Sequence, residues 1–328
     1  FLVVSVAAGA VTLFGAGLLY AAAGTVHLSA LPEALEGVPA QAGPLTATGA
    51  AMIVAGLAFK VAAVPLHAWA PGVYDRAPLP IAAYLSTASK LGGAAALLWV
   101  ATIGLTPLLH VVGPILAAIA AATMTVGNLG ALRQTRAVRL LAWSSIAQAG
   151  YLLAPLGAFA VVAGREPAAV DTATAAVLAF AAFYVILELT AFASVVGLRG
   201  GAADGGPLED YRGSLRRAPL LSLALILALI GLAGLPPGLA GLFAKITIMS
   251  ALADAVPWLG VIVAVNAVIG LVYYLKFTLV VIDTRWTSQT ATDEPARPWP
   301  VAATVAAGAI VLVVLGFTPQ YVVDVIFQ

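Results

Sequence analysis

Residues 59–90 read FKVAAVPLHAWAPGVYDRAPLPIAAYLSTASK, a largely apolar stretch with prolines inside it and a lysine near each end. Lys60 lies just before Val64–Pro65, and Lys90 ends the stretch. A proline inside a helix removes a hydrogen bond and clashes with the preceding turn, which leaves backbone carbonyls without partners. In hydrocarbon these groups must be satisfied by protein or water, so the stretch predicts a broken membrane helix beside a polar interior.

The composition around this stretch is that of an integral membrane protein. Hydrophobic residues make up 62% of the chain and charged residues 9%, and the apolar runs are too long for helices of a soluble domain. At about twenty residues per span we expect roughly nine transmembrane helices. They are predicted near 1–23, 47–70, 79–103, 107–131, 140–162, 168–198, 215–252 (long and broken), 256–283 and 299–318. The predicted fold class is therefore all-α, a polytopic transmembrane bundle with proline-broken helices.

A second break is predicted at Leu235–Pro236–Pro237–Gly238, with Lys245 about two turns beyond it. An apolar run, a break and a lysine thus occur twice, which indicates a repeated helical unit of the kind that transporters use. We divide the chain into 1–103, the last part of a first repeat, then 104–283, a second five-helix repeat, and 284–328, a loop and a final helix.

The arginines fall between the apolar runs and gather in alternate connections. Because cytoplasmic loops collect basic residues, this alternation predicts that Phe1 starts on the cytoplasmic side and that the 24–46 loop faces outward. The basic connections hold Arg76, then Arg133, Arg136 and Arg139, then Arg199, Arg212, Arg216 and Arg217, then Arg285 and Arg297, while Arg165 alone falls in the others. The chain opens at Phe1 within an apolar run without a basic leader, so we interpret it as N-terminally truncated and not as starting with a signal peptide.

All four lysines lie inside apolar runs. An ammonium at the bilayer centre costs about 2.5–3.5 kcal/mol, so repeated placement there requires a compensating role. A single lysine is equally well explained as a cap on free carbonyls or as a side chain that reaches the interface, and Lys276 fits that explanation best. Taken together, Lys60, Lys90 and Lys245 favour proton or ion conduction, because desolvation lets an amine release its proton.

Other polar residues in the apolar part have two interpretations each. His67 is a candidate relay residue or a structural hydrogen-bonding residue at the break. Glu188, an acid deep in a span, either neutralises a lysine and joins the relay or bonds across helices as a neutral acid. Ser144, Ser145 and Gln148 form a polar helix face that can hold water or join helices.

Several activities are excluded for this chain. Without cysteine it cannot ligate an iron–sulfur cluster or form a disulfide. It has no glycine-rich phosphate loop, no metal ligands at workable spacing and no nucleophile arrangement. We therefore expect no cofactor-binding site and no metal site here, so that any redox chemistry belongs to another subunit.

The stretch 59–90 resembles the central motif of the antiporter-like subunits of respiratory complex I, the proton-pumping NADH:quinone oxidoreductase. Three further segments agree in the same order: NLGALRQTRAVRLLAWSSIAQAGYLL (128–153), EDYRGSLRRAPLLSLALILALIGLAGLPPGLAGLFAK (209–245) and GLVYYLKFTLVVI (270–282). Among these subunits the VYDRAP continuation and Lys245 are most similar to the N type. The resemblance implies an antiporter-like inverted-repeat fold with a hydrated polar axis, in which Lys60 is the charge-switching lysine of the entry side, Lys90 the connecting lysine and Lys245 the exit group.

The same resemblance implies where the protein works and with what. It implies a multi-pass subunit of the bacterial cytoplasmic membrane, a translocase component with neighbouring antiporter-like and small membrane subunits and the lipid bilayer as partners, and no nucleic acid. NADH, FMN, iron–sulfur clusters and quinone are expected in other subunits. Two alternatives remain: a subunit of a multisubunit sodium/proton antiporter, and a scaffold whose buried charges only fix helix packing.

Three departures from the family pattern bear on the relay. The family's glutamate that pairs with the first lysine lies on an earlier helix, outside this chain. Gln148 stands where the family commonly has histidine, and an amide cannot take up a proton. Glu188 stands where a small or amide residue is usual, followed by Thr190 where glycine is common.

Overall fold

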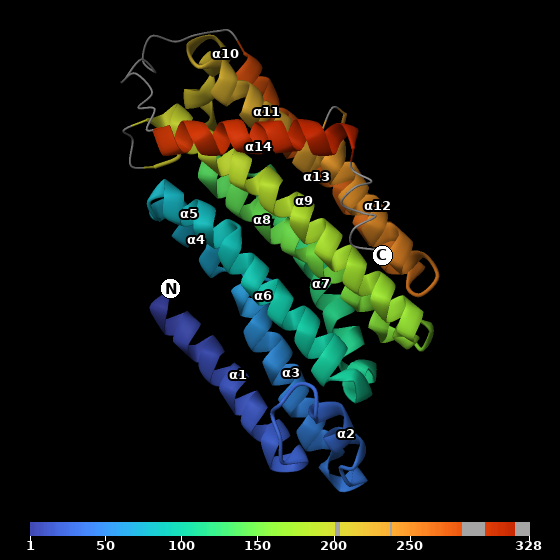
Figure 1. Ribbon diagram of the computed structural model, residues 1–328. Coiled ribbons are helices and arrows are strands. Elements are labelled where there is room, and N and C mark those ends of the chain that lie inside the picture. Colours follow the sequence, from blue (N-terminus) through green and yellow to red (C-terminus); the bar gives the residue numbers. More distant parts are fainter. Residues whose placement is uncertain (201–203, 237, 284–298, 319–328) are drawn as a thin grey trace.

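The computed structural model describes residues 1–200, 204–236, 238–283 and 299–318 (Figure 1). Pro237, Arg285, Arg297 and the predicted loop 284–298 lie outside the described residues. The α-helices are α1 (Leu2–Ala23), α2 (Leu31–Glu36), α3 (Gly43–Lys60), α4 (Trp69–Arg76), α5 (Leu79–Ser86), α6 (Ala88–Trp99), α7 (Leu109–Leu132), α8 (Ala137–Leu153), α9 (Pro167–Arg199), α10 (Ser214–Arg217), α11 (Pro219–Ala233), α12 (Leu239–Ala253), α13 (Pro257–Ile282) and α14 (Trp299–Phe317).

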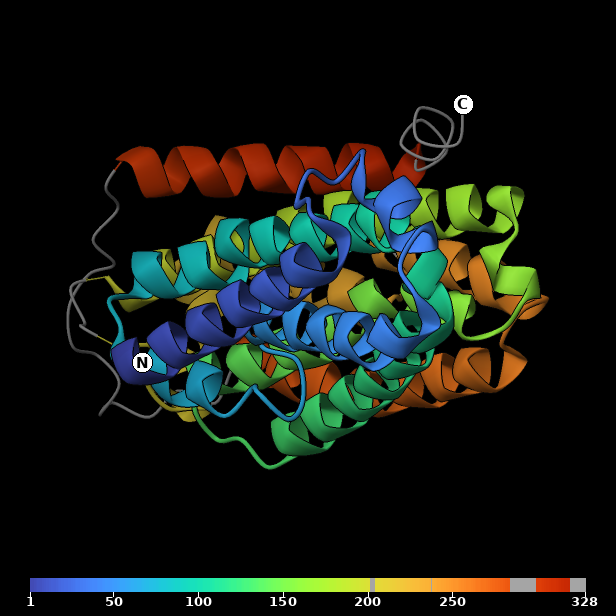
Figure 2. The ribbon, with the colours of Figure 1, turned by 90° about the horizontal axis from the view of Figure 1, so that it is seen from below.

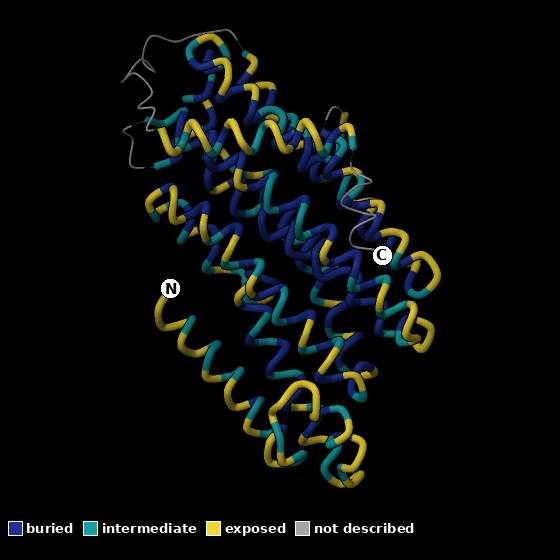
Figure 3. Tube along the Cα trace, viewed as in Figure 1, coloured by how far each residue is buried: buried dark blue, intermediate teal, exposed yellow. Residues whose placement is uncertain are grey.

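The helices form one elongated bundle with α8 near its centre. α1 lies at one side of the bundle and α14 at another, where it crosses the other helices (Figures 1 and 2). Burial follows this arrangement, since α1 and α14 carry long exposed stretches while α8 is covered (Figure 3). In α8 every residue except Arg139 and Trp143 is buried. Ser144, Ser145 and Gln148 of α8 therefore face other helices and not the membrane.

The span prediction is confirmed in outline. Seven helical stretches of the described residues are long and apolar enough to cross a membrane, and α11 and α12 are shorter apolar helices. α8 ends at Leu153 and continues as a 3₁₀ turn over Ala154–Ala160, which together match the predicted span 140–162. With this segment and the broken α11–α12 unit, the count agrees with about nine spans of twenty residues.

The first predicted break is present between α3 and α4. α3 ends at Lys60, and α4 begins at Trp69 after a turn that contains the cis Val64–Pro65 bond. Protein groups satisfy the exposed backbone of the turn, because the Trp69 Nε1 donates to the Phe59 carbonyl (3.3 Å) and Val64 N donates to the Thr123 hydroxyl (2.9 Å). The requirement that freed backbone groups find partners in a membrane is thus met here by side chains.

The sequence did not predict a third break, which separates α5 from α6 at Thr87. Thr87 has φ −111° and ψ −89°, outside helical values. The hydroxyls of Ser86 and Thr87 both donate to the Ala83 carbonyl, at 2.9 and 2.7 Å. Hydroxyl bonds of this kind weaken a helix, and here two adjacent hydroxyls share one carbonyl, whereas single bonds of this kind occur in the unbroken α7 and α9.

The arginine-rich connections meet at one end of the bundle, as the alternation predicted. Arg136, between α7 and α8, pairs with Asp75 of α4 (3.0 Å) and with Asp204 (2.7 Å). Arg199 at the end of α9 pairs with Asp204 (3.2 Å) and Asp210 (2.6 Å). This basic end is confirmed, and its assignment to the cytoplasmic side stays a prediction.

Candidate functional site

Lys90 starts a hydrogen-bonded series in the core of the bundle. Its ammonium, on a side chain only 1% exposed, donates to both the carbonyl and the hydroxyl of Ser145 at 2.6 Å. The Ser145 hydroxyl lies 2.9 Å from the Tyr184 hydroxyl, which donates to the Ser86 carbonyl at 2.6 Å. Because the proton of Tyr184 is committed to Ser86, the Ser145 hydroxyl is the donor to Tyr184. This branch of the series ends at the break between α5 and α6.

Glu188 lies one turn beyond Tyr184 on α9 and is fully buried. Neither carboxylate oxygen has a hydrogen-bond partner within the described residues, and the carboxyl interacts electrostatically with Lys90. Tyr74 of α4, also fully buried, lies near the Ser145 side chain and within electrostatic range of Glu188. Buried polar atoms of this kind normally bond to ordered water. The arrangement around Glu188 is therefore suited to hold water next to Lys90.

The polar face of α8 continues the series from Ser145 toward α13. The Ser144 hydroxyl is 2.5 Å from the Tyr274 hydroxyl, and the Gln148 amide donates to the same hydroxyl at 2.9 Å. The rings of Tyr274 and Tyr273 are 4.4 Å apart between centroids. Gln148 is thus a hydrogen-bond donor that positions a tyrosine hydroxyl on α13.

Two asparagines join this group to the far side of the core. The Tyr273 hydroxyl donates to the Asn128 side-chain carbonyl at 2.9 Å. The Asn128 amide nitrogen donates to the Asn266 side-chain carbonyl at 3.0 Å. The Asn128 amide also lies 3.4 Å from the Tyr151 hydroxyl. Each asparagine is buried in a transmembrane helix, where an amide requires partners on neighbouring helices.

Lys245 of α12 ends the series at the second predicted break. Its ammonium donates to the carbonyls of Leu232 and Ala233, at 3.0 and 2.8 Å, where α11 stops. It also lies 5.6 Å from the centre of the Tyr151 ring, a distance that permits a cation–π interaction. Lys245 thus caps free carbonyls, as one interpretation of an intramembrane lysine predicted, and also contacts the polar series.

Lys90 and Lys245 therefore lie at the two ends of one buried line of polar side chains. The line is not hydrogen-bonded throughout, because Ser145 and Ser144 are only chain neighbours on α8 and Tyr151 meets Lys245 through its ring. The sequence predicted both lysines and the polar face of α8. It did not single out the tyrosines and asparagines that join them, although hydroxyls and amides in the middle of apolar spans were the available signal. The joining residues are, in order from Lys90, Ser145, Ser144, Tyr274, Tyr273, Asn128 and Tyr151, with Tyr184, Gln148 and Asn266 bonded at the side.

The structure does not bring Lys60 and His67 into this line. Lys60, the last residue of α3, is exposed, and its ammonium has no hydrogen bond or ion pair within the described chain. Its Cβ packs where Gly93 of α6 leaves room, one turn beyond Lys90. His67 is half-buried with its Nδ1 unbonded among described residues, and its ring lies 5.5 Å from that of Trp143. Both residues lie at the α3–α4 break, beside the line.

The remaining basic and metal-binding candidates are simpler. Lys276 is exposed, and its ammonium donates to the Gln134 carbonyl at 3.2 Å. It thus caps a backbone carbonyl in the connection between α7 and α8, as predicted for this lysine. Among the described residues no three His, Cys, Asp or Glu side chains group as a metal site would require. The chemistry that the described site can perform is therefore proton exchange along hydroxyls, amines and one carboxyl.

Comparison with known proteins identifies similar chains. The family model described as "NADH:quinone oxidoreductase/Mrp antiporter, TM" matches residues 1–270. NADH-quinone oxidoreductase subunit N of Salinispora tropica is 50% identical over 99% of this chain, and subunit N 2 of Streptomyces griseus is 42% identical over 98%. The chain covers 67% and 62% of the lengths of these two relatives.

Solved structures agree with the observed fold. A chain of respiratory complex I from Thermus thermophilus matches 98% of this chain with a TM-score of 0.77 and 34% identity, and this chain covers 67% of it. A chain of the Mrp complex from Dietzia matches 99% with a TM-score of 0.81 at 20% identity, and 65% of that chain is covered. The Mrp match shows likeness of fold alone.

Proposed function

The chain belongs to the family of NADH:quinone oxidoreductase and Mrp antiporter membrane subunits, and from that premise we propose that it translocates protons as an N-type subunit in the membrane arm of an NADH:quinone oxidoreductase. In this proposal the chain sits as a multi-pass protein in a bacterial cytoplasmic membrane beside other antiporter-like and small membrane subunits. NADH oxidation on FMN and iron–sulfur clusters, and quinone reduction, take place in other subunits, since this chain has no cysteine.

The observation that carries the proposal is the buried line between Lys90 and Lys245. Side chains that both donate and accept can pass a proton by successive exchange of hydrogen bonds, and Ser145, Ser144, Tyr274 and Tyr273 are of this type. Between Ser145 and Ser144, which share no hydrogen bond, a water molecule would carry the proton. The amides of Gln148, Asn128 and Asn266 cannot take up a proton, and their part is to hold the hydroxyls in position. Water next to these amides would complete the exchange, which is how we account for glutamine at position 148.

Glu188 supplies the counter-charge that Lys90 otherwise lacks. Lys90 with Glu188 carries no net charge whether the shared proton resides on the amine or on the carboxyl, which avoids an isolated charge in the core. Uptake of a second proton gives an ammonium beside a neutral acid, a net charge of one. Release of that proton toward Ser145 and Tyr184 returns the pair to neutrality.

The proposal gives Lys60 and His67 the entry side of the path. Support for this role is their location at the α3–α4 break, with Lys60 packed one turn from Lys90 on the facing helix. Lys245 is the exit-side group, since its ammonium already contacts carbonyls that the second break leaves free. Redox-driven changes in neighbouring subunits would alter the protonation of these ends in turn.

Proton-pumping measurements on substituted complexes test the proposal. Lys245→Ala and Lys60→Ala, each in the assembled complex, are expected to lower the ratio of protons moved to electrons transferred. Lys276→Ala is the matched control, because Lys276 is exposed and donates to the Gln134 carbonyl outside the buried line. An unchanged ratio in all three complexes would reject the assigned roles.

The family also includes Mrp antiporters, so a sodium/proton antiporter subunit is the second candidate. The fold likeness to the Mrp chain favours neither candidate, because both share the helices and the lysines. Purification of the native assembly separates them. Flavin and iron–sulfur clusters that copurify support the oxidoreductase, and their absence from an active ion exchanger would support the antiporter.

A further inference from the structure

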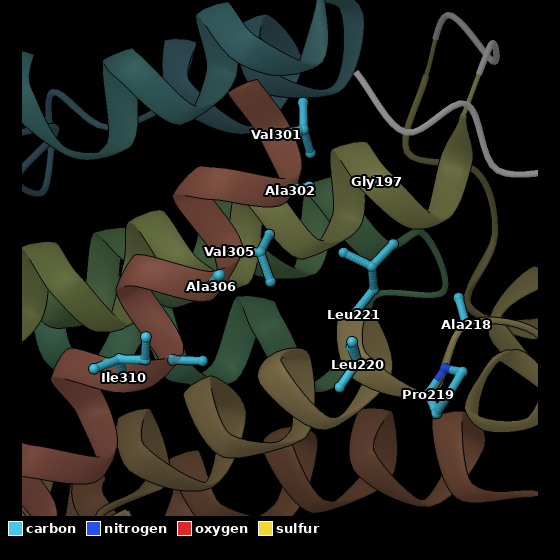
Figure 4. A pocket seen from close by; sticks show the side chains of 11 residues that line it. Gly197, Ala218, Pro219, Leu220, Leu221, Val301, Ala302, Val305, Ala306 and Ile310 are labelled. Carbon is cyan, nitrogen blue, oxygen red and sulfur yellow. The ribbon is translucent and has the colours of Figure 1, made fainter. Parts of the chain in front are cut away.

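An apolar groove opens between α14, the start of α11 and the end of α9 (Figure 4). Its volume is about 430 Å³, and all of its lining residues are apolar. Small side chains on α14 leave the space, since Ala302, Ala306 and Ala309 are among its lining residues. The lining is Gly197, Ala218, Pro219, Leu220, Leu221, Val301, Ala302, Val305, Ala306, Ala309 and Ile310.

The shape of the groove suits one extended hydrocarbon chain. Its lining follows α14 from Val301 to Ile310, which at 1.5 Å per residue is about 13 Å along the helix. Leu220 and Ile310 on its rim are 81% and 64% exposed, so the groove is open to its surroundings. In a membrane that opening faces lipid tails.

One end of the groove lies at the basic end of the bundle. Arg217 directly precedes Ala218 and donates to the Asp210 carbonyl at 3.1 Å. Arg216 is exposed, and its guanidinium has no hydrogen bond or ion pair to a described residue. Trp299, 80% exposed at the start of α14, adds an aromatic side chain of the type found at membrane interfaces.

The acidic side chains at this end do not neutralise Arg216. Asp204 and Asp210 pair with Arg199, and Glu209 lies 3.7 Å from Arg212. An anionic group above the groove would therefore meet an available cation. Basic residues next to membrane helices attract anionic lipid headgroups for this reason.

We propose that the groove binds an acyl chain of a phospholipid whose anionic headgroup lies beside Arg216 and Arg217. The apolar lining takes the chain, and the two arginines select the charge of the headgroup. A zwitterionic lipid would fill the same space without a net charge to match Arg216. The site is separate from the Lys90–Lys245 line and does not depend on proton translocation.

Photo-crosslinking in the intact complex tests this site. The complex is placed in nanodiscs of phosphatidylcholine with a small fraction of phosphatidylglycerol that carries a photoreactive acyl chain. We expect labelled peptides to include 301–310 and 218–221. Unlabelled phosphatidylglycerol should compete at about fivefold lower concentration than phosphatidylcholine, since a basic residue near the surface contributes about 1 kcal/mol to the attraction of anionic lipid.

Substitutions separate the acyl site from the headgroup site. Ala306→Phe fills the groove and should abolish the labelling, whereas Val313→Phe, on the same helix outside the groove, should not. Arg216→Gln should remove the preference for phosphatidylglycerol, and Arg133→Gln, exposed at the same end, should keep it.

Three results would overturn the proposal, and two of them need only the unsubstituted complex. Equal competition by the two lipids would mean an unselective boundary lipid. Absence of lipid label from the groove, or a crosslink from it to a neighbouring protein, would mean that protein covers it. Labelling unchanged by Ala306→Phe would place the lipid elsewhere.

Discussion

Lys90 and Lys245 are both buried amines, but different groups hold them. Lys90 donates to a serine hydroxyl that leads to further hydroxyls, and it has an acid as neighbour. Lys245 donates to two backbone carbonyls and faces a tyrosine ring, and carbonyls cannot accept a proton for onward transfer. Proton exchange with Lys245 must therefore pass through water or a change in the second break, whereas Lys90 can exchange within the described side chains.

Substitution of Glu188 tests whether the acid acts on Lys90. Glu188→Gln preserves shape but removes the counter-charge, so the ion-paired form with no net charge is lost. Lys90 can then hold a proton only as an isolated buried ammonium, and the neutral amine is favoured. We expect normal assembly and a lower proton-to-electron ratio, with the proton step slowed by about a hundredfold. Proton uptake by vesicles during NADH oxidation measures both the proton-to-electron ratio and the rate of the proton step.

Two further variants keep the Glu188 prediction falsifiable. Glu166→Gln, at the exposed start of α9, is the control and should pump normally. Glu188→Asp restores an acid and should recover part of the ratio. A packing role for Glu188 would instead give full pumping with glutamine and reduced assembly with the shorter aspartate.

Tyr274 is the residue on which two α8 side chains converge. Tyr274→Phe removes the hydroxyl that Ser144 and Gln148 share and leaves both buried groups without this partner, at a cost of about 1–3 kcal/mol. We expect a stable complex with slowed pumping and a larger solvent deuterium effect on turnover. Tyr84→Phe, exposed on α5, should change neither. Identical pumping in the two variants would remove Tyr274 from the path.

At the scale of helices, the prediction succeeded where a single residue type imposes the structure. Pro65 and Pro236 break their spans because proline cannot complete the helix ladder, and apolar length defines the other spans. The α5–α6 break at Thr87 was missed because no proline marks it, and because hydroxyl bonds like those to the Ala83 carbonyl also occur in unbroken helices such as α7 and α9.

The candidate site was predictable only in part for a related reason. Intramembrane lysines are conspicuous because their burial is costly, so Lys90 and Lys245 stand out in the sequence. The bonds that join them connect residues up to 145 positions apart, such as Tyr273 and Asn128, and depend on how helices pack. A single sequence does not indicate which distant residues form such hydrogen bonds. Lys60 was predicted with the other two, yet only helix placement reveals that it lies beside the line and not in it.

Contact between α7 and α8 depends on glycine, and this gives an element-scale prediction. A Cβ on Gly127 would overlap the backbone of Ala147, which lies between Ser145 and Gln148 on α8. Gly127→Val should therefore push α8 away, lose at least about 1–3 kcal/mol and reduce the amount of assembled complex. Gly9→Val on α1, where a Cβ meets nothing within 4 Å, is the matched control. Equal thermal stability of the two variants in detergent would contradict this account of the packing.

Across the whole molecule, ion pairs at the basic end tie together segments far apart in the chain. Asp75 of α4, Arg136 before α8 and Arg199 at the end of α9 meet through Asp204 and Asp210. The broken helix that carries Asp75 is thereby linked to α9, which carries Tyr184 and Glu188. Each partly exposed pair contributes little by itself, so the network fixes positions more than it adds stability.

Asp204 gives this network a pH dependence with a definite sign. The hydrogen bond from Arg136 holds the pKa of the Asp204 carboxyl below its usual value, so the pairs stabilise the folded state above about pH 4, where an unfolded aspartate is ionised. That stability is lost as the pH falls through the lower folded-state pKa. At neutral pH, Asp204→Asn should lower the thermal midpoint in detergent by the equivalent of less than about 1 kcal/mol. Below about pH 4 the midpoints of the two proteins should converge. Asp171 is exposed near the start of α9, so Asp171→Asn is the control and should have the thermal midpoint of the unsubstituted protein at every pH. A difference in thermal midpoint between Asp204→Asn and the unsubstituted protein that grows in acid would show that the carboxylate is not the stabilising form.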